Sequence, residues 1–424
     1  MNVTDRQYAL DLDKNDPLAH FKSKFVITDP AMCYLDGNSL GRLPHATVVA
    51  VNNFLTQEWG PEVVTGWSHW VDEAQPVGDL IGEASLGAAK GQVLACDTTS
   101  VNFYQLCLAA IKARPGRKTI ITDTANFPTD RYILDGIAKE FGLNLVLIDN
   151  ESAGTIKHER ITAEILAPYL NDDVALVTLE VIQYRSGART DIKSITDLVR
   201  SHGGLVVWDA SHAVGAIEMN FDANGVDLAV GCTYKYGNSG PGAPAWLYVS
   251  HAMQKQLQVP IQGWFSQADQ FGMGPVFEKA DGIRGFQIAS PSLIGLRCIK
   301  TSFEIIKEAG IDAIAHKAAV GTQMMIDLYD AWLAPLGIEL NTSRDPKERG
   351  GHISLVHPDA ARICVALREF ANVIPDYRTP NSIRLAISPL PTSYVEVWDG
   401  FERIRDLVST RQYEKVKEGG SRVT

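Results

Sequence analysis

Strand-like and helix-like segments alternate along the middle of this 424-residue sequence, and this alternation is the feature that most constrains its fold. Apolar segments typical of buried strands occupy 118–123, 143–149, 174–182, 204–209 and 226–232. Amphipathic segments typical of helices lie between them at 129–141, 160–171 and 191–202. The pattern predicts an α/β fold with a mainly parallel sheet flanked by helices, and ligands bound at the carboxyl ends of its strands.

The C-terminal part of the chain predicts a second, smaller α/β unit. From about residue 297 a helical pattern of apolar residues continues to 333, which predicts one long helix linking two domains. Strand-like and helical segments then alternate up to a last helix at 394–413. We therefore expect a large domain over 30–299 and a small domain built from 1–29 and 300–424.

The loop that follows the segment 226–232 carries the most informative residue. It reads GCTYKYGNSGPGAP, with Lys235 between two tyrosines and with glycines that leave space beside the amine. A lysine at the end of a buried strand is partly desolvated, which makes its amine available to attack carbonyl carbons. A solvated lysine beside a turn is the simpler interpretation, and the loop alone does not exclude it.

A second strand end supplies complementary chemistry. The segment 206–216 reads VVWDASHAVGA, so that Asp209 and His212 follow an apolar strand. A lysine amine forms a Schiff base with pyridoxal phosphate (PLP), and a buried carboxylate holds a proton on its pyridine nitrogen. Lys235 and Asp209 therefore predict a PLP site at the edge of the sheet.

Three further segments contain candidate ligand-binding residues. In VLACDTTSVNF, Thr99 and Ser100 open a helix, where hydroxyl and N–H groups can bind a phosphate or merely cap the helix. In TDTANFPTD, Phe127 can stack on an aromatic ring, with Asp130 nearby, or can pack in a Pro turn. In YLDGNSLGRLP, Asn38 lies in a turn that either faces a ligand or covers the surface.

Aromatic and basic residues complete the candidate set. Trp67, in VVTGWSHW, can line a pocket or cover the core, and Trp264, in GWF, occupies a polar loop where we expect it to face a ligand. Arg384 lies in a strand of the C-terminal unit. Its guanidinium suits a substrate α-carboxylate, although any single arginine can also be a surface charge.

Composition narrows the functional class. The formal charge of −11 argues against general binding to nucleic acid or to anionic membranes. The sequence has no apolar run of about 18 residues and no apolar signal core near Met1, so we expect a cytoplasmic protein. The six cysteines are scattered without a CxxC pair, which favours reduced thiols and no metal site.

Together, YLDGNSLGRLP, NFPTD, WDASHAVG, TYKYGNSGPG, GWF and RGGH resemble the kynureninase family of fold-type I PLP-dependent enzymes, in the aminotransferase class V group. The resemblance covers most of the chain. It implies hydrolytic cleavage of the Cβ–Cγ bond of L-kynurenine, or of 3-hydroxykynurenine, to anthranilate or 3-hydroxyanthranilate and L-alanine. It also implies a homodimer with shared active sites and a place in tryptophan catabolism by the kynurenine pathway, which leads to NAD biosynthesis.

The family's residue roles carry over to matching positions. Lys235 would hold PLP, Asp209 would pair with the pyridine nitrogen, and Arg384 would bind the substrate carboxylate. Tyr234 would lie at the phosphate of PLP, and it is also our candidate proton donor. Trp67 occupies a position that bears on the preference between kynurenine and 3-hydroxykynurenine. The other residues implied to bind PLP are Thr99, Ser100, Phe127, Asp130, His212 and, from the partner subunit, Trp264 and Ser290, while Asn38 would face the substrate.

Two alternatives stay open at this point. One is a kynureninase-like enzyme that acts on a modified kynurenine in a biosynthetic pathway. The other is a different class V enzyme, such as a cysteine desulfurase or selenocysteine lyase. Those enzymes usually carry a histidine before the Schiff-base lysine and a mobile cysteine loop, whereas this chain has Tyr234 and the segment RGGHISL without a cysteine.

Overall fold

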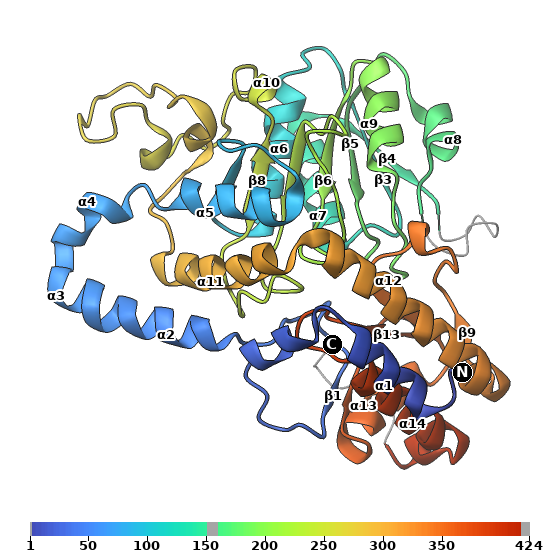
Figure 1. Cartoon of the computed structure of the whole chain (residues 1–424). Helices are drawn as coiled ribbons and strands as arrows, with labels where there is room; N and C mark the ends of the chain where they lie inside the picture. Colours follow the sequence, from blue (N-terminus) through green and yellow to red (C-terminus); the bar gives the residue numbers. More distant parts are fainter. Residues whose placement is uncertain (1, 151–159, 417–424) are drawn as a thin grey trace.

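A seven-stranded sheet forms the centre of the protein, in a computed structural model that describes residues 2–150 and 160–416 (Figure 1). Its spatial order is β2 (Val93–Ala95), β8 (Trp246–Val249), β7 (Leu228–Gly231), β6 (Leu205–Asp209), β5 (Val174–Glu180), β3 (Thr119–Asp123) and β4 (Asn144–Ile148). Strands β7, β6, β5, β3 and β4 are parallel, and β8 pairs antiparallel with β7 and β2. The predicted mainly parallel α/β sheet is confirmed.

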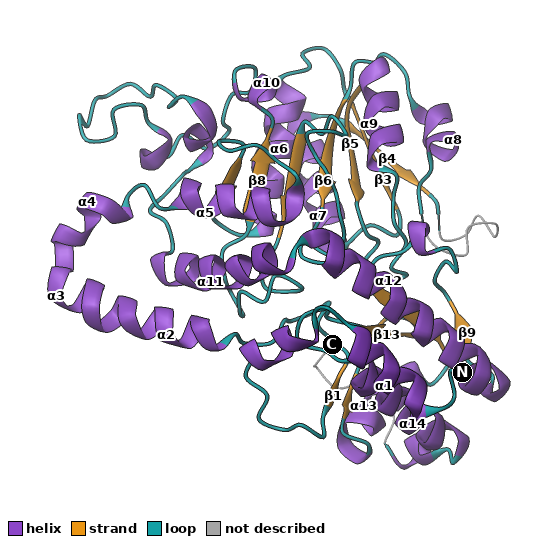
Figure 2. Cartoon of the chain, in the orientation of Figure 1, coloured by secondary structure: helices purple, strands orange, loops and turns teal. Residues whose placement is uncertain are grey.

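Helices cover both faces of this sheet, so that its strands are buried on both sides. In Figure 2, α5 (Ala74–Ile81) lies in front of the sheet and α6 (Thr99–Lys112) lies behind it. The remaining helices of this part are α7 (Pro128–Phe141), α8 (Ala163–Leu166), α9 (Ile192–Ser201) and α10 (His251–Gln254). Every residue of β5 and β6 is buried, which explains why these strands are nearly continuous apolar runs in the sequence.

A smaller antiparallel sheet lies in the C-terminal part. Its order is β12 (Asp376–Arg378), β13 (Ser382–Ala386), β10 (His352–Val356) and β9 (Glu339–Leu340). Helices α13 (Ala360–Phe370) and α14 (Tyr394–Ser409) belong to this part, and α1 (Arg6–Asn15) packs beside α14 (Figure 1). Strand β1 (Cys33–Tyr34) pairs with β11 (Val373–Ile374), so the start of the chain joins the C-terminal part.

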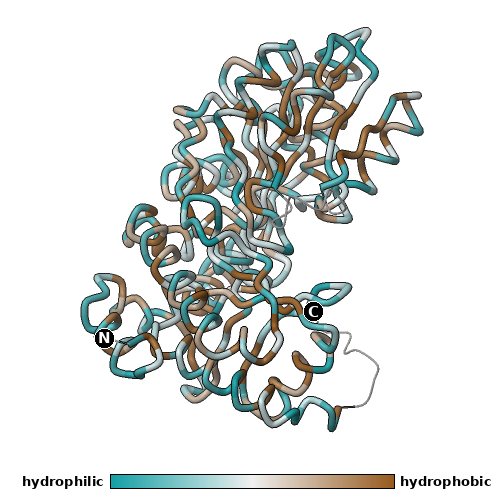
Figure 3. The backbone as a smooth tube through the Cα atoms, turned by 90° about the vertical axis from the view of Figure 1, so that its right-hand side faces the viewer, coloured by the Kyte–Doolittle hydropathy of each residue, from teal (hydrophilic) through white to brown (hydrophobic). Residues whose placement is uncertain are grey.

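Two separate hydrophobic cores accompany the two sheets. One core surrounds the seven-stranded sheet, and the other contains Leu35, Ile353, Leu385 and Phe401 around the smaller sheet. In the side view, hydrophobic segments run through the middle of the upper body (Figure 3). Two cores suit the proposed division into a large and a small domain, and its boundaries near residues 30 and 300 stay a prediction.

The long helix expected from about residue 297 is two helices, and that prediction is wrong. Helix α11 (Leu293–Ala309) ends at Gly310, whose φ of 80° lies outside the helical region, and α12 (Ile311–Leu328) begins directly after it. A glycine adopts this conformation without the steric penalty of a side chain, so the apolar periodicity continues across the break. None of the helices in the described ranges has the length and apolar character needed to cross a membrane.

An arm of short helices extends away from both sheets. It comprises α2 (His45–Asn53), α3 (Gly60–Glu62) and α4 (Trp67–Trp70), at the left of Figure 1. Apolar side chains on this arm are unusually exposed, with Val64 at 72% and Trp59 at 53%. Such a concentration of exposed apolar side chains is typical of a surface that another protein covers.

Candidate active site

A cavity of about 350 Å³ lies at the carboxyl ends of β5, β6 and β7. This is the edge at which a parallel sheet usually binds ligands, and the volume suits a small molecule. Eight of the residues proposed from the sequence line it: Thr99, Ser100, Phe127, Asp130, Asp209, His212, Tyr234 and Lys235. Residues that the sequence interpretation did not single out, including Thr98, Thr129, Glu180 and Ser211, also line it.

Lys235 is placed in this cavity by the loop after β7. Its Nζ lies 3.2 Å from Nε2 and 3.4 Å from Nδ1 of His212, and 6.0 Å from the ring centroid of Phe127. The loop is held from the other side by Gly41, whose backbone N–H donates to the carbonyl of Tyr234 at 2.8 Å. A Cβ at Gly41 would lie 2.4 Å from the carbonyl oxygen of Lys235, so this close approach requires glycine.

Buried carboxyl groups form a cluster beside the lysine. Asp209 ends β6 in direct register with Glu180 at the end of β5, and Asp130 lies in the first turn of α7. All three are less than a tenth exposed. Burial and the nearby charge of Asp209 raise the pKa values of Asp130 and Glu180 well above their usual range. Burial thus favours the protonated forms of Asp130 and Glu180 beside Asp209.

Glu180 is the functional candidate that the sequence interpretation missed. It ends an otherwise apolar strand, and its Oε2 accepts from the backbone N–H of Tyr184 at 3.3 Å. In the orientation that satisfies its amide, Gln183 also donates to this oxygen at 2.7 Å. The available signal was an acidic residue at the carboxyl end of a buried parallel strand, next to the strand that ends in Asp209.

The N-terminus of α6 forms the opposite wall of the cavity. The hydroxyl of Thr98 caps this helix by accepting from the N–H of Val101 at 3.3 Å, while Thr99 and Ser100 line the cavity. Free N–H groups, hydroxyl groups and the positive end of the helix dipole together favour an anion such as a phosphate. A phosphate-binding role for these hydroxyl groups stays a prediction.

Two titratable side chains of the cavity are held in their neutral forms. Burial, with the charges of Lys235 and Arg384 close by, lowers the pKa of His212 well below its usual value. Proximity to Cys232, together with burial, raises the pKa of Tyr234. Tyr234 therefore keeps its phenolic proton, and His212 offers a neutral imidazole to its neighbours.

Arg384 and Asn38 lie behind His212 rather than in the wall of the cavity. Nη1 of Arg384 is 3.4 Å from Nε2 of His212, and Nη2 donates to Oγ of Ser39 at 3.1 Å. In the orientation that satisfies its amide, Asn38 accepts from Nε and Nη2 of Arg384 at 3.2 Å. The N-terminal loop and the smaller sheet thus meet at this guanidinium.

Trp67, Trp264 and Ser290 lie outside the cavity in a single chain. All three are exposed, with Trp264 at 47% and Trp67 at 36%. Trp67 contacts Phe265, the neighbour of Trp264, with ring centroids 6.5 Å apart, so the arm and the GWF loop meet here. A role for these side chains at the cavity therefore requires a second subunit.

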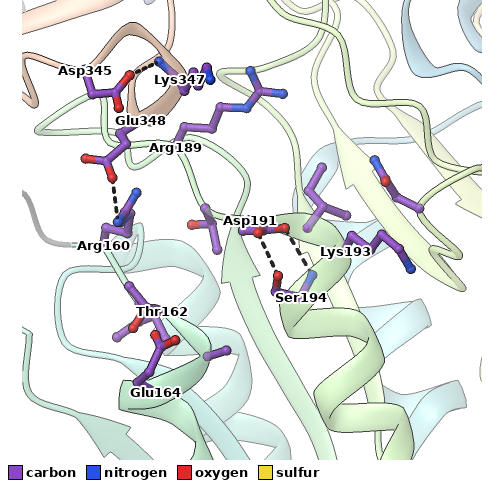
Figure 4. A pocket seen from close by; sticks show the side chains of 15 residues that line it. Arg160, Thr162, Glu164, Arg189, Asp191, Lys193, Ser194, Asp345, Lys347 and Glu348 are labelled. Atoms are coloured by element: carbon purple, nitrogen blue, oxygen red, sulfur yellow. Dashed lines mark hydrogen bonds and ion pairs between the residues drawn. The ribbon is translucent and has the colours of Figure 1, made fainter.

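A larger cavity of about 620 Å³ lies elsewhere, at the start of α8 and α9 (Figure 4). In its lining, Arg160 pairs with Glu348 at 2.9 Å, and Asp191 accepts from Oγ and N–H of Ser194. None of the candidate residues lines it. Its composition gives no reaction chemistry, so the smaller cavity is the candidate active site.

The residues of the smaller cavity fit PLP. Lys235 offers the amine, Asp209 the carboxylate, and the start of α6 the anion site. Among the described residues, Oδ2 of Asp97 and Oδ2 of Asp130 are buried without a hydrogen-bond partner. Buried oxygens of this kind are rare in native proteins and are expected where a polar ligand completes the site.

Comparisons with known proteins point to one family. A family model described as the kynureninase C-terminal domain matches residues 314–404. A protein named kynureninase from Pseudomonas fluorescens is 31% identical, over 98% of each chain, and one from Burkholderia pseudomallei (strain K96243) is 33% identical, over 96% of each.

Solved structures show the same fold. A C-DES mutant with glycine covalently linked to its PLP cofactor matches with a TM-score of 0.75 at 17% identity, covering 96% of this chain and 98% of that one. The cysteine desulfurase CsdA from Escherichia coli matches with a TM-score of 0.75 at 14% identity, covering 94% and 99%. The fold is therefore that of fold-type I PLP-dependent enzymes.

Proposed function

The chain belongs to the kynureninase family, and on this basis we propose that it hydrolyses the Cβ–Cγ bond of L-kynurenine to give anthranilate and L-alanine. The observation that carries this proposal is the convergence of Lys235 and Asp209 on one cavity in a chain with this family membership. Full-length similarity to proteins named kynureninase supports the reaction class.

PLP is the cofactor that the proposed reaction requires, and when bound it supplies an electron sink for the carbon atoms next to the substrate amine. Lys235 would hold it covalently, and Asp209 would keep its pyridine nitrogen protonated. Thr99 and Ser100 would bind its phosphate at the start of α6. Phe127 would lie against the ring, since its side chain forms part of the same wall as Asp130.

Proton transfers in this proposal fall to residues of the lysine loop. Freed from the cofactor, Nζ of Lys235 would take the proton from Cα of the substrate. Tyr234 would donate a proton to the product, because its phenol stays protonated in this environment. Arg384, whose guanidinium lies behind His212 and contacts Ser39, would bind the α-carboxylate.

Replacing the lysine tests the assignment. Lys235→Ala should abolish the visible absorbance of the bound cofactor and nearly all turnover, because it removes both the covalent anchor and the proposed base. Turnover is followed by the fluorescence of anthranilate. Lys255→Ala, at an exposed lysine outside the cavity, is the matched control. Retention of cofactor absorbance or of substantial turnover by Lys235→Ala would contradict the proposal.

The ring substituent of the substrate is tested directly. Incubation with kynurenine and with 3-hydroxykynurenine, each compared with a substrate-free control, shows whether anthranilate or 3-hydroxyanthranilate forms faster. We expect both to be cleaved, with a preference that changes in Trp67→Ala. Failure to release either product would favour the alternative that the chain acts on a modified kynurenine.

A cysteine desulfurase or selenocysteine lyase is the less favoured alternative. Solved desulfurases share the fold at low identity. Within the described part of the chain, however, no cysteine lines the cavity, and five of the six cysteines are buried. A persulfide-forming reaction on cysteine needs an accessible thiol, so absence of sulfide release from L-cysteine is the expected result.

We also propose that the working enzyme is a cytoplasmic homodimer in which Trp264 and Ser290 complete the partner's active site. Exposed apolar side chains on the arm and on the loop after Trp264, including Phe271 and Val276, support a protein interface. An open groove of about 520 Å³ beside the cavity shares Gly242 and Ala243 with it, which connects this surface to the site.

Mixed dimers test this arrangement. Lys235→Ala and Trp264→Ala homodimers should each be weakly active. Dissociating and mixing them should restore activity in those heterodimers that carry one intact site. Light scattering gives the oligomeric state, and cell fractionation gives the location. A monomer in solution, or no recovery after verified exchange of subunits, would contradict the shared site.

A further inference from the structure

Arg384 lies among carboxyl groups of the protein itself. Its side chain is fully buried in β13, and it forms an ion pair with Asp376, which is its register partner in β12. Arg378 donates from Nε to the same carboxylate oxygen, Oδ2 of Asp376, at 3.1 Å. The guanidinium that is proposed to bind a substrate carboxylate is thus already paired with an internal one.

A second buried carboxyl group belongs to the turn that bonds Arg384, because the carbonyl of Asp36 accepts from the N–H of Ser39, whose hydroxyl accepts from Arg384. Asp36, from the YLDGNSLGRLP turn, is 7% exposed, and Asp376 is fully buried. Oδ1 of each has no hydrogen-bond partner among the described residues. Ionisation of a buried carboxyl near an ion pair that already contains a carboxylate is unfavourable, so Asp36 is expected to hold a proton more readily than an exposed aspartate. No role in the proposed reaction uses Asp36.

Burial and the charge of Asp376 raise the pKa of Asp36 to about 7, although Ser39, Arg384 and Arg378 act in the opposite direction. The other titratable groups around this cluster stay neutral, because burial raises the pKa values of the phenols and the thiol and lowers those of the imidazoles. They come from five segments: Tyr34, Tyr236, Cys364, His212 and His352. Arg378 and Arg384 are the cations that act on Asp36.

The net charge around Arg384 therefore depends on one proton. With Asp36 protonated, two guanidinium groups face one carboxylate, and an arriving anion meets a net positive site. With Asp36 ionised, the internal carboxylates neutralise both cations, and a third carboxylate is repelled. Because these groups are buried, solvent screening reduces this effect only weakly.

We propose that Asp36, near the Asp376–Arg384 ion pair, sets the anion affinity of Arg384, so that binding of the substrate α-carboxylate is coupled to uptake of one proton by Asp36. The proposal rests on the proposed function of Arg384, which is to bind the substrate α-carboxylate. The proton comes from solvent and ends on a carboxyl oxygen of Asp36, and no other bond changes. Asp36 touches neither substrate nor cofactor in this role and acts through Arg384 as a positioning residue.

The experiment compares two ligands of the holoenzyme. One is an α-amino acid substrate analogue, and the other is the matching amine without the carboxylate. Their dissociation constants are measured from pH 6 to pH 8.5 by the change in visible absorbance of the bound cofactor. The ratio of the two constants cancels titrations of the amine and of Lys235, which both ligands share.

In the unmodified protein the acid should lose affinity relative to the amine above pH 7, by up to about tenfold per pH unit. Calorimetry in buffers of different ionisation enthalpy should show uptake of about one extra proton for the acid at pH 8. Asp36→Asn should match the unmodified protein at pH 6, bind the acid up to about 30-fold more tightly at pH 8.5, and take up no extra proton. Asp172→Asn, at an exposed carboxylate, is the control.

A ratio that does not change with pH in the unmodified protein, or a dependence that persists in Asp36→Asn, would overturn the proposal. If Asp36→Asn does not fold, Asp376→Asn serves instead, because loss of the neighbouring carboxylate should move the midpoint of the ratio to lower pH. Arg384→Lys distinguishes failure of the proposed function of Arg384 from failure of the proton coupling. If this variant still discriminates between acid and amine as the unmodified protein does, Arg384 does not bind the substrate carboxylate. If it loses that discrimination while Asp36→Asn keeps the pH dependence of the unmodified protein, only the proton coupling is refuted.

Discussion

Replacement of Asp36 by asparagine should change how the stability of the fold depends on pH. The buried carboxyl has a pKa raised from 3.8 to about 7 in the folded protein, through burial and the charge of Asp376. Between these two values the folded state binds the proton and the unfolded state does not. Stability must therefore fall as pH rises through this window and become independent of this group above pH 7.

The size of the effect follows from the pKa difference. Each pKa unit corresponds to about 1.4 kcal/mol, and the interval between pH 5 and pH 7 lies inside the window. The unmodified protein should thus lose about 3 kcal/mol of unfolding free energy through Asp36 between pH 5 and pH 8. Asparagine imitates the protonated acid at every pH, so Asp36→Asn should not show this loss.

Urea unfolding of the cofactor-free protein, followed by tryptophan fluorescence at one protein concentration, measures this difference. The stability of Asp36→Asn relative to the unmodified protein should increase from pH 5 to pH 8. Asp172→Asn, where the carboxylate is exposed, should show no such increase. A constant difference between Asp36→Asn and the unmodified protein over this range would show that Asp36 ionises normally, and the argument about this carboxyl would fail.

Three further substitutions give defined outcomes. Gly41→Ala places a Cβ 2.4 Å from the carbonyl oxygen of Lys235, so urea unfolding should show a free energy of unfolding lower by about 1–3 kcal/mol. An unchanged free energy of unfolding would contradict the close packing of these two loops. Tyr234→Phe should lower kcat by about 10²–10⁴-fold with little change in KM, and an unchanged kcat would remove its role as proton donor. The buried side chain of Lys317 pairs with that of Asp16 at 2.7 Å in the unmodified protein. Lys317→Met leaves Asp16 without this cation, so the free energy of unfolding should fall by about 3–5 kcal/mol. A variant as stable as the unmodified protein would contradict the importance of this pair.

The large sheet could be predicted from the sequence because its strands are buried on both faces. A strand such as β5 then appears as a nearly continuous apolar segment without the periodicity of an amphipathic helix. The cavity followed from the same property, since parallel strands bring their carboxyl ends to one edge. Asp209 and Lys235 were found in this way, each directly after an apolar run.

Residues whose role depends on register could not be found in this way. Glu180 lies beside Asp209 only because β5 and β6 pair in that register, and Asp376 faces Arg384 only across an antiparallel pair. Asp36 approaches them from a turn more than 300 positions away in the sequence. The periodicity that predicted one long helix was equally uninformative about Gly310, since a single residue with positive φ leaves the apolar pattern intact.

The groups proposed to recognise the two ends of an α-amino acid come from different sheets, and this separation has a consequence. Lys235 is fixed to the large sheet by β7, while Arg384 belongs to β13 of the smaller sheet. The distance between amine and carboxylate sites is set by contacts that join the two parts. These are the bonds from Arg384 to the carbonyl of Tyr184 and to Ser39, and the bond from Gly41 to the lysine loop. A change at the contacts of Arg384 should therefore alter selection for the α-carboxylate while leaving cofactor attachment intact, whereas a change near Asp209 should do the reverse.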